Sequence, residues 1–321
     1  MTFRWCAAGC ISLVLALGAV SSVSAHGLAG KRFFPSTLVV DDPFVSDELS
    51  LPVVSHIKLP ASEDQPHMKI TDVSGEFSKR ITPNLGFSLG GDWLYLDKDG
   101  KQDHSGFGNL EIGLKYQFFK SDAHETILSA GFEMEIGGTG RALVGAENFD
   151  VYKPTLFFGK GMGDLPDSLA YLKPFAITGT VGGEIPSRRS SRKIRPGEEE
   201  GEVEIEKEYH PNVFTWGIAI EYSIPYLQSF VRDFGLPKPL SQLIPVVEVE
   251  FQHPLDRGQS GQFTATVNPG IIWAGRYFQI ALEAIVPVND RTGKNVGIRG
   301  QLHFFLDDIF PNSIGKPLFG R

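Results

Sequence analysis

The stretch VGIRGQLHFFL, residues 296–306, decides the fold that this sequence predicts. Its apolar residues are Ile298, Leu302, Phe304 and Leu306, and its polar residues are Arg299, Gln301 and His303. Because successive side chains of a β-strand point to opposite faces, this alternation gives the strand one apolar face and one polar face. Such a strand separates an apolar environment from water across a single layer of backbone.

The same two-residue period recurs along nearly the whole chain. Together with turn residues, it predicts about twelve strands, at residues 49–59, 68–81, 85–96, 107–119, 125–136, 151–162, 172–184, 212–223, 244–253, 263–274, 277–288 and 296–306. An even number suits a bacterial single-chain barrel with both termini on the inner side. After Val20, no run approaches the roughly 18 apolar residues that a spanning helix needs. The predicted fold is all-β, an antiparallel transmembrane β-barrel of about twelve strands.

The N-terminus has the layout of a secretory leader. Arg4 precedes an apolar core at residues 11–20, and Val23, Ser24 and Ala25 match a small-residue cleavage site. The predicted organisation is a signal peptide at 1–25, an N-terminal periplasmic segment or plug at 26–48, a β-barrel at 49–306 and a C-terminal tail at 307–321. After signal-peptide cleavage, such a protein would lie in the outer membrane of a Gram-negative bacterium.

Composition and motif spacing argue against several functions. Cys6 and Cys10 both lie in the leader, so the mature chain would carry no disulfide and no cysteine-ligated metal. The net charge of -8 at pH 7 argues against nucleic acid as a partner. The histidines show no HxH, HxxxH or HExxH spacing, so no metal or cofactor is predicted. Asp103, His104 and Ser105 are adjacent and cannot form a triad, so no catalytic residue and no enzyme activity are predicted.

Loop lengths and aromatic positions favour a membrane barrel. If the first strand runs outward, long polar loops fall on the outer side and tight turns on the inner side, except for residues 224–242. Aromatic residues expected at the inner strand ends are Tyr116, Phe118, Tyr222, Trp273, Tyr277, Phe278 and Phe304, and those expected toward the outer ends are Trp93, Tyr95, Tyr152, Phe214 and Phe251. A soluble periplasmic β protein, with the same alternation turned inside out, is the alternative.

In a membrane barrel the charged strand faces must point into the lumen, because Arg299 at a lipid-facing midplane position would cost about 2–4 kcal/mol. The predicted lumen-lining residues are Glu111, Lys115, Glu133, Glu135, Glu248, Glu250, Glu283 and Arg299. Crowded carboxylates must be protonated, paired, or solvated by water or cations. The sequence favours equally a pore that tolerates cations or neutral solutes and a lumen filled by a satisfied polar network.

Three further segments have charge or hydrophobic patterns that predict their local structure. Residues 33–51 place carboxylates among hydrophobic residues, and they could plug the lumen from the inner side or form an extended periplasmic tail. In residues 187–210 a basic block precedes a run of glutamates, which predicts a hairpin that neutralises both. That hairpin could contact lipopolysaccharide phosphates, cap the pore mouth or remain a solvated loop. In residues 224–242, Leu227, Phe230, Val231 and Phe234 are spaced as one helical face, although an ordinary ordered loop fits equally.

The run GFGNLEIGLKYQFF, residues 106–119, resembles the Gly-x-Gly-(Asp/Asn)-Leu-x-x-Gly-x-Lys-Tyr strand of the outer-membrane β-barrel porins associated with phenol meta-cleavage pathways. Beyond these residues the resemblance rests on strand pattern and barrel size. It implies an outer-membrane channel for small, often hydrophobic or aromatic compounds, and it transfers no functional residues. The chain departs from a common barrel ending, because a tail to Arg321 follows Phe304 and Phe305 where a terminal aromatic is usual.

The function predicted from the sequence is an outer-membrane channel for small solutes, passive or weakly selective, with an acidic lumen. The alternatives are a non-conducting outer-membrane barrel with a structural or surface-binding role, and the soluble periplasmic protein. The predicted partners are outer-membrane lipid, lipopolysaccharide and a small-molecule solute. Because a single chain closes its own barrel, a monomer is the default, with an oligomer left open.

Overall fold

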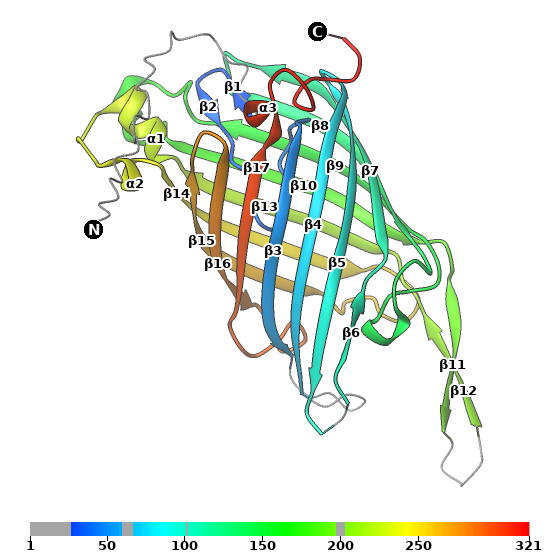
Figure 1. Cartoon of the computed structure of the whole chain (residues 1–321). Coiled ribbons are helices and arrows are strands. Elements are labelled where there is room, and N and C mark those ends of the chain that lie inside the picture. The colour runs from blue at the N-terminus through cyan, green and yellow to red at the C-terminus, as the bar shows by residue number, and fades with distance from the viewer. Residues whose placement is uncertain (1–26, 60–66, 101, 197–202, 321) are drawn as a thin grey trace, which may run out of the picture.

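The computed structural model of this chain describes residues 27–59, 67–100, 102–196 and 203–320 (Figure 1). The predicted signal peptide, residues 1–25, lies outside the described residues, as does Gly197 of the expected hairpin turn.

Twelve antiparallel strands form one closed barrel (Figure 1). They are β3 (Glu48–Leu59), β4 (Met68–Thr82), β5 (Leu85–Lys98), β7 (Leu110–Ser121), β8 (Thr126–Ile136), β9 (Val151–Gly161), β10 (Phe175–Pro186), β13 (Val213–Tyr222), β14 (Leu243–Pro254), β15 (Thr264–Ala274), β16 (Phe278–Pro287) and β17 (Gly297–Phe305). The pairing of β3 with β17 joins the first strand to the last, and the pairing of β4 with β5 completes the ring. The predicted all-β fold, an antiparallel barrel of twelve strands, is confirmed.

The predicted strand at 107–119 is interrupted at Gly108 and Asn109. The short strand β6 (His104–Phe107) and β7 both pair with β5, one after the other, so they form one strand with an irregular junction. At this junction the Gly108 N–H donates to the Asp92 carbonyl at 3.0 Å. The predicted strand at 172–184 begins later, at Phe175, because a short 3-10 helix, η2 (Asp167–Leu172), precedes it.

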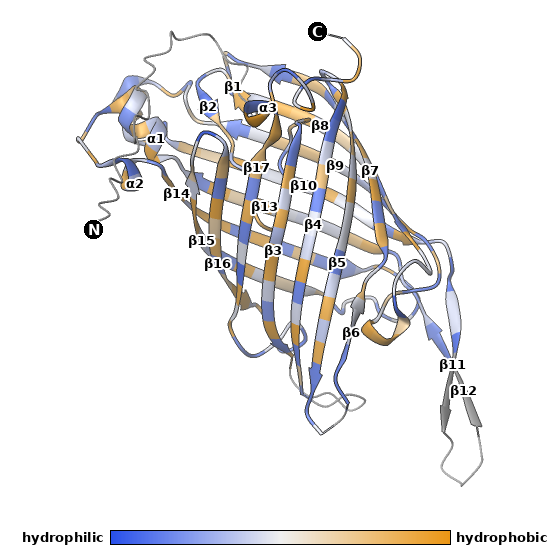
Figure 2. Ribbon diagram, viewed as in Figure 1, coloured by the Kyte–Doolittle hydropathy of each residue, from blue (hydrophilic) through white to orange (hydrophobic). Residues whose placement is uncertain are grey.

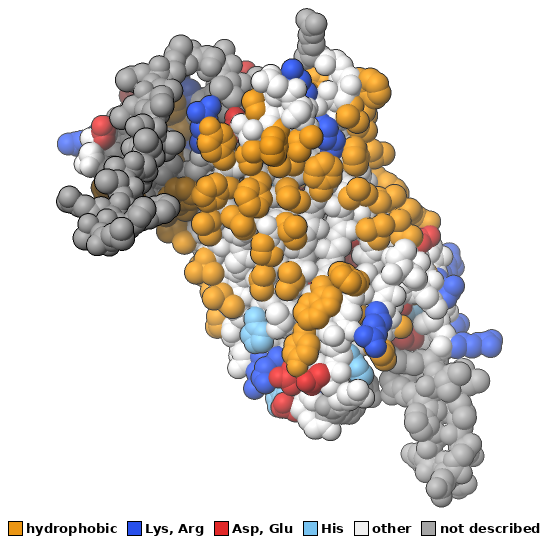
Figure 3. Space-filling model, viewed as in Figure 1, with side chains coloured by type: hydrophobic (Ala, Val, Ile, Leu, Met, Phe, Trp, Pro, Cys, Tyr) orange, Lys and Arg blue, Asp and Glu red, His pale blue; other side chains and the backbone are white. Residues whose placement is uncertain are grey.

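The two faces of the barrel wall are opposite in character. Outward side chains such as Leu114, Leu156 and Leu282 are apolar and more than half exposed, whereas inward Asn268 and Gln279 are fully buried. Figure 2 shows the alternation along the strands, and Figure 3 shows apolar side chains covering the wall, with charged side chains gathered near its ends. Lipid suits such an exposed apolar band on a closed barrel, which argues against the soluble alternative.

Several expected aromatic residues are exposed on this outer surface. Tyr116, Phe118 and Tyr277 lie toward the inner strand ends, and Tyr95 and Phe214 lie toward the outer ends. Aromatic rings at both ends of an apolar band sit at the depth of the lipid headgroups.

The expected helix in residues 224–242 is present and short. Helix α1 (Ile224–Tyr226) runs into a π-helical turn, η3 (Leu227–Val231), and α2 (Lys238–Ser241) follows. The Ser223 side chain caps α1 by accepting the Tyr226 N–H at 3.2 Å. None of the described helices has the length and apolar character needed to cross a membrane.

The charged loop forms a hairpin beyond the outer end of the barrel, as predicted (Figure 1). Strand β11 (Ser190–Pro196) pairs with β12 (Val203–Tyr209), and the register places Lys193 opposite Glu206 and Arg195 opposite Glu204. A second outer loop contains the short 3-10 helix η1 (Ala142–Val144), whose neighbour Arg141 donates its N–H to the Phe107 carbonyl at 2.8 Å.

The N-terminal segment, residues 27–47, lies inside the barrel. It begins with the small ribbon of β1 (Leu28–Ala29) and β2 (Arg32–Phe33) at the inner end. Beyond that ribbon, wall side chains from β7, β8, β14, β16 and β17 hydrogen-bond to it. After β17, α3 (Leu306–Ile309) leads into the tail, where Leu318 and Phe319 donate N–H groups to carbonyls of β4.

Candidate functional site

The lumen is the candidate site, because inward positions of the strands carry the polar side chains of the wall. The predicted lumen residues lie on five strands: Glu111 and Lys115 on β7, Glu133 and Glu135 on β8, Glu248 and Glu250 on β14, Glu283 on β16, and Arg299 on β17. Each of these residues contacts other polar groups in the lumen. One set, the outer set, lies toward the outer end, and the other set contacts the N-terminal segment.

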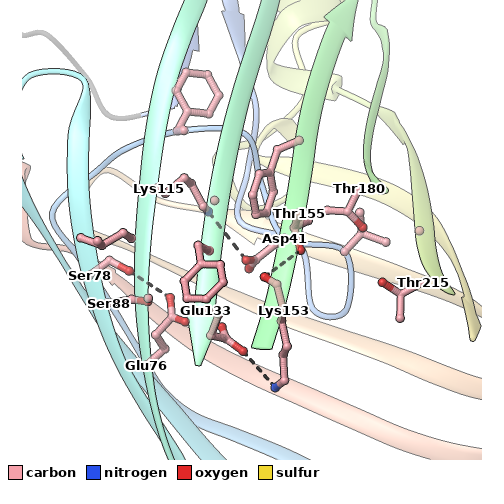
Figure 4. Close-up of a pocket in the computed structure, with 18 of the residues that line it drawn as sticks. Asp41, Glu76, Ser78, Ser88, Lys115, Glu133, Lys153, Thr155, Thr180 and Thr215 are labelled. Carbon is pink, nitrogen blue, oxygen red and sulfur yellow. Dashed lines mark hydrogen bonds and ion pairs between the residues drawn. The ribbon is translucent and has the colours of Figure 1, made fainter. Parts of the chain in front are cut away.

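In the outer set, one lysine lies between two of the predicted carboxylates. Lys153 of β9 forms ion pairs with Glu111 and, at 2.9 Å, with Glu133, and Figure 4 shows the pair with Glu133. Glu133 is directly opposite Lys153 in the β8–β9 register. Lys153 was not among the predicted lumen residues, although it lies in a predicted strand. Its ion pairs with Glu111 and Glu133 depend on which strands lie beside one another in the barrel.

The other predicted outer residues each have a polar partner. Arg299 and Glu283 are opposite one another in the β16–β17 register and form an ion pair of 2.7 Å. Glu135 accepts a hydrogen bond from the Asn109 side chain at 2.8 Å. Glu250 accepts one from Gln252 at 3.2 Å.

Two of the predicted residues contact the N-terminal segment instead of open lumen. Glu248 is completely buried, and its carboxylate accepts backbone N–H groups from residues 38–40. Lys115 donates to the Asp42 carbonyl at 3.0 Å, lies 3.7 Å from the Asp41 carboxylate and sits over the Phe157 ring. Of the eight predicted lumen residues, Glu248 and Lys115 therefore face the N-terminal segment, and Glu248 lies behind it.

A cavity of about 240 Å³ lies against the N-terminal segment (Figure 4). It is bordered by the carboxylates of Asp41, Glu48, Glu76, Glu133, Glu184 and Glu250 and by only two ammonium groups, those of Lys115 and Lys153. Within the described part of the chain, Glu76, Glu184 and Glu250 have no ion-pair partner. Carboxylates thus outnumber ammonium groups around this cavity, called the acidic cavity below, and Phe44 and Phe157 add apolar surface to it.

A second hollow, of about 340 Å³, adjoins the first at Glu250 and Gln252. Its charged residues are mainly basic: Lys58, Arg291 and Arg299 stand against Glu250 alone. The basic hollow lies toward the outer end of the barrel, and the acidic cavity extends from there to the N-terminal segment.

Buried ionic contacts fix the N-terminal segment at both of its ends. Arg32, fully buried, donates to Glu125 at 3.3 Å and to the Pro174 carbonyl at 2.9 Å, and it stacks on the Tyr226 ring. At the other end, Asp47 binds both Lys79 and Arg80 at 2.8 Å. Breaking a buried pair leaves an uncompensated charge, so both ends are held firmly.

Between these ends, the segment crosses the lumen. Inward glycines of the wall make room for it: Cβ atoms built on Gly86, Gly159 and Gly217 would meet Val45, Pro43 and Val40 at 2.9 Å. These glycines belong to β5, β9 and β13, which are spread around the barrel. Residues 34–46 therefore occupy the inner half of the lumen, and the acidic cavity ends against them.

No protein-family model matches this sequence, and no curated protein matches it. Among solved structures, the fold is similar to the COG4313 outer membrane channel from Pseudomonas putida F1, with a TM-score of 0.54 and 12% identity over 85% of this chain and 99% of that one. A looser similarity connects it to the KdgM porin, with a TM-score of 0.41 and 12% identity over 79% of this chain and 97% of that one. The first similarity agrees with the fold described above: a closed outer-membrane β-barrel.

Proposed function

We propose that this chain is an outer-membrane channel for small solutes, closed at its inner half by residues 34–46 until that segment moves. The observation that carries the proposal is the acidic cavity inside a closed barrel whose outer surface suits lipid. The similar fold of the Pseudomonas putida channel supports it.

The acidic cavity gives the channel a preference for cations and neutral solutes over anions. Six carboxylates face two ammonium groups there, and a low-dielectric wall strengthens the field of the excess negative charge. The acidic cavity borders the N-terminal segment, whereas the basic hollow lies toward the outer end of the barrel. Every permeating solute must pass this cavity, which therefore sets the preference.

The solute class that we propose is small compounds with apolar or aromatic bodies. The resemblance of residues 106–119 to porins associated with phenol meta-cleavage pathways supports this class. Phe44 and Phe157 on the cavity surface offer such a solute apolar contact beside the carboxylates.

The test is planar-bilayer conductance of the mature protein and of a disulfide-locked variant, Val40→Cys/Gly217→Cys. A Cβ at Gly217 would lie 2.9 Å from Val40 Cγ2, close enough for a disulfide to form after small adjustment. The chain has no cysteine after residue 10, so no other thiol interferes. We expect conductance from the wild type and the reduced variant, and loss of conductance on oxidation.

Selectivity is measured in the same bilayers from the reversal potential in a KCl gradient. The wild type should prefer K⁺, and Glu184→Gln/Glu250→Gln should lose much of that preference because two unpaired carboxylates are removed. If all folded, inserted variants stay silent, including the reduced locked variant, the channel proposal is wrong. A non-conducting barrel with a structural or surface-binding role would then be the better account.

A further inference from the structure

Three successive backbone N–H groups of the N-terminal segment converge on one carboxylate. Leu38 donates to Glu248 Oε1 at 2.8 Å, and Val39 and Val40 donate to Oε2 at 2.9 and 2.7 Å. Glu248 and Val40 are both buried and Leu38 and Val39 are half-buried, so water has little access to these bonds in the closed arrangement. Successive N–H groups arranged in this way form a concave anion site, a backbone nest.

Between the two ends of the segment, its other described hydrogen bonds with wall side chains have the opposite polarity. Gln279 donates to the Ser36 carbonyl, Gln301 to that of Thr37 at 3.4 Å, and Lys115 to that of Asp42 at 3.0 Å. In these contacts the wall supplies donors, whereas only Glu248 supplies acceptors to the consecutive N–H groups. Losing Glu248 would leave three neighbouring donors without their acceptor, which costs more than losing one bond to a carbonyl.

The position of the nest makes it suitable as a latch. The ends of the segment are fixed by Arg32 and Asp47, and the nest lies between them, where the segment meets β14. A chain held at both ends can leave the lumen only by moving its middle. The bonds to Glu248 are the densest set of hydrogen bonds that resist this motion among the described residues.

We propose that the nest formed by Leu38, Val39 and Val40 is a carboxylate-binding site, and that Glu248 occupies it as the latch that keeps the channel closed. This proposal rests on the channel function proposed above. The ligand class is a small monocarboxylate. Glu248→Ala would remove one CH₂ and the carboxylate, a volume that acetate can fill with its own methyl and carboxylate.

The experiment is bilayer conductance of wild type, Glu248→Ala and Glu248→Gln, with and without acetate at constant ionic strength. Glu248→Ala should raise the open fraction at least about tenfold, because the nest loses its acceptor. Acetate should reverse most of this increase, whereas acetamide, its neutral counterpart, should not. Glu248→Gln keeps one acceptor oxygen and places an NH₂ group against the nest. Its open fraction should therefore be lower than that of Glu248→Ala, and acetate should not change it.

Gln301→Ala is the matched control. It removes a wall donor from the Thr37 carbonyl, so it loosens the same segment without emptying the nest. Acetate cannot replace a donor, and the conductance of this variant should therefore not respond to it.

The outcomes separate the two proposals. If the reduced Val40→Cys/Gly217→Cys variant conducts but Glu248→Ala behaves as wild type, or opens without responding to acetate, the latch proposal is overturned and the channel stands. If no folded variant conducts, both proposals fail. Closure of Glu248→Ala by acetate, without an effect on Gln301→Ala, supports the nest as a carboxylate site.

Discussion

Glu248 and Lys153 illustrate two ways in which a barrel lumen accommodates a charge. Glu248 accepts three backbone N–H groups of the N-terminal segment, and Lys153 bridges Glu111 and Glu133. Burying a charge without such partners is very costly, so each arrangement must form before the lumen can pack. Neither residue can be moved without leaving another group unsatisfied.

Gly108 is a residue whose replacement should disturb the wall. A Cβ at Gly108 would fall 1.9 Å from Asp92 Oδ1, whereas a Cβ at Gly91 would meet nothing within 4 Å. Gly108→Ala must displace Asp92 or the strand junction, and we expect it to lower the free energy of unfolding by about 1–3 kcal/mol. Gly91→Ala should change it by less than about 0.5 kcal/mol. Urea unfolding of the barrel in phospholipid vesicles measures both, and equal effects would contradict the steric explanation.

Among the elements, the N-terminal segment depends most on distant partners. The ribbon of β1 and β2 contains only two residues in each strand and cannot be stable alone. It is held by the inner turns of the barrel, through Arg32 and through the Gly30 N–H, which donates to Asp122 Oδ1 at 2.9 Å. The segment is therefore ordered by the barrel, and its order should respond to conditions that change these contacts.

The Gly30 contact predicts a local pH dependence. The N–H of Gly30, aided by Lys120, holds the pKa of Asp122 below its ordinary value. Because the pKa is lowered in the folded state, the contact stabilises the ribbon above about pH 4 and is lost as pH falls through the lowered pKa. A spin label at Lys31→Cys should become more mobile on acidification below this range. In an Asp122→Asn background the same label should lose this response, and an unchanged response would assign the transition to another group.

For the molecule as a whole, the apolar surface lies outside and the polar groups lie inside. Each strand contributes to both surfaces, because its side chains alternate. The closed ring also leaves no strand of the barrel wall with an unpaired edge, which a membrane interior requires. The surface and the closure thus depend on the same twelve strands.

This arrangement predicts where a charge is tolerated. Leu282 lies on the outer face in the middle of β16 and is 52% exposed. Leu282→Arg should lower the free energy of unfolding in phospholipid vesicles by about 2–4 kcal/mol, because lipid cannot solvate the guanidinium. Gln252→Arg, beside Glu250 in the lumen, should change it by less than about 0.5 kcal/mol. A small effect at both positions would show that the outer face does not contact lipid.

The extent of prediction from sequence differed between the wall and its contents. The bounds of the strands near 68–81, 85–96 and 263–274 were predicted to within two residues, because alternation is a local property. The interruption at Gly108 was missed, since it depends on the Asp92 carbonyl of a neighbouring strand. Lys153 was missed for the same reason, because its pairing with Glu133 depends on the register of β8 with β9.

The sequence by itself determined that this chain forms about twelve amphipathic strands, because the side-chain period of a strand is written directly in neighbouring residues. Only the tertiary structure decided between a plug and an external tail for the N-terminal segment. The contact that places the segment joins Leu38 to Glu248, 210 residues apart. No local pattern records such a contact, since it exists only after the barrel has closed and brought its inward groups around one lumen.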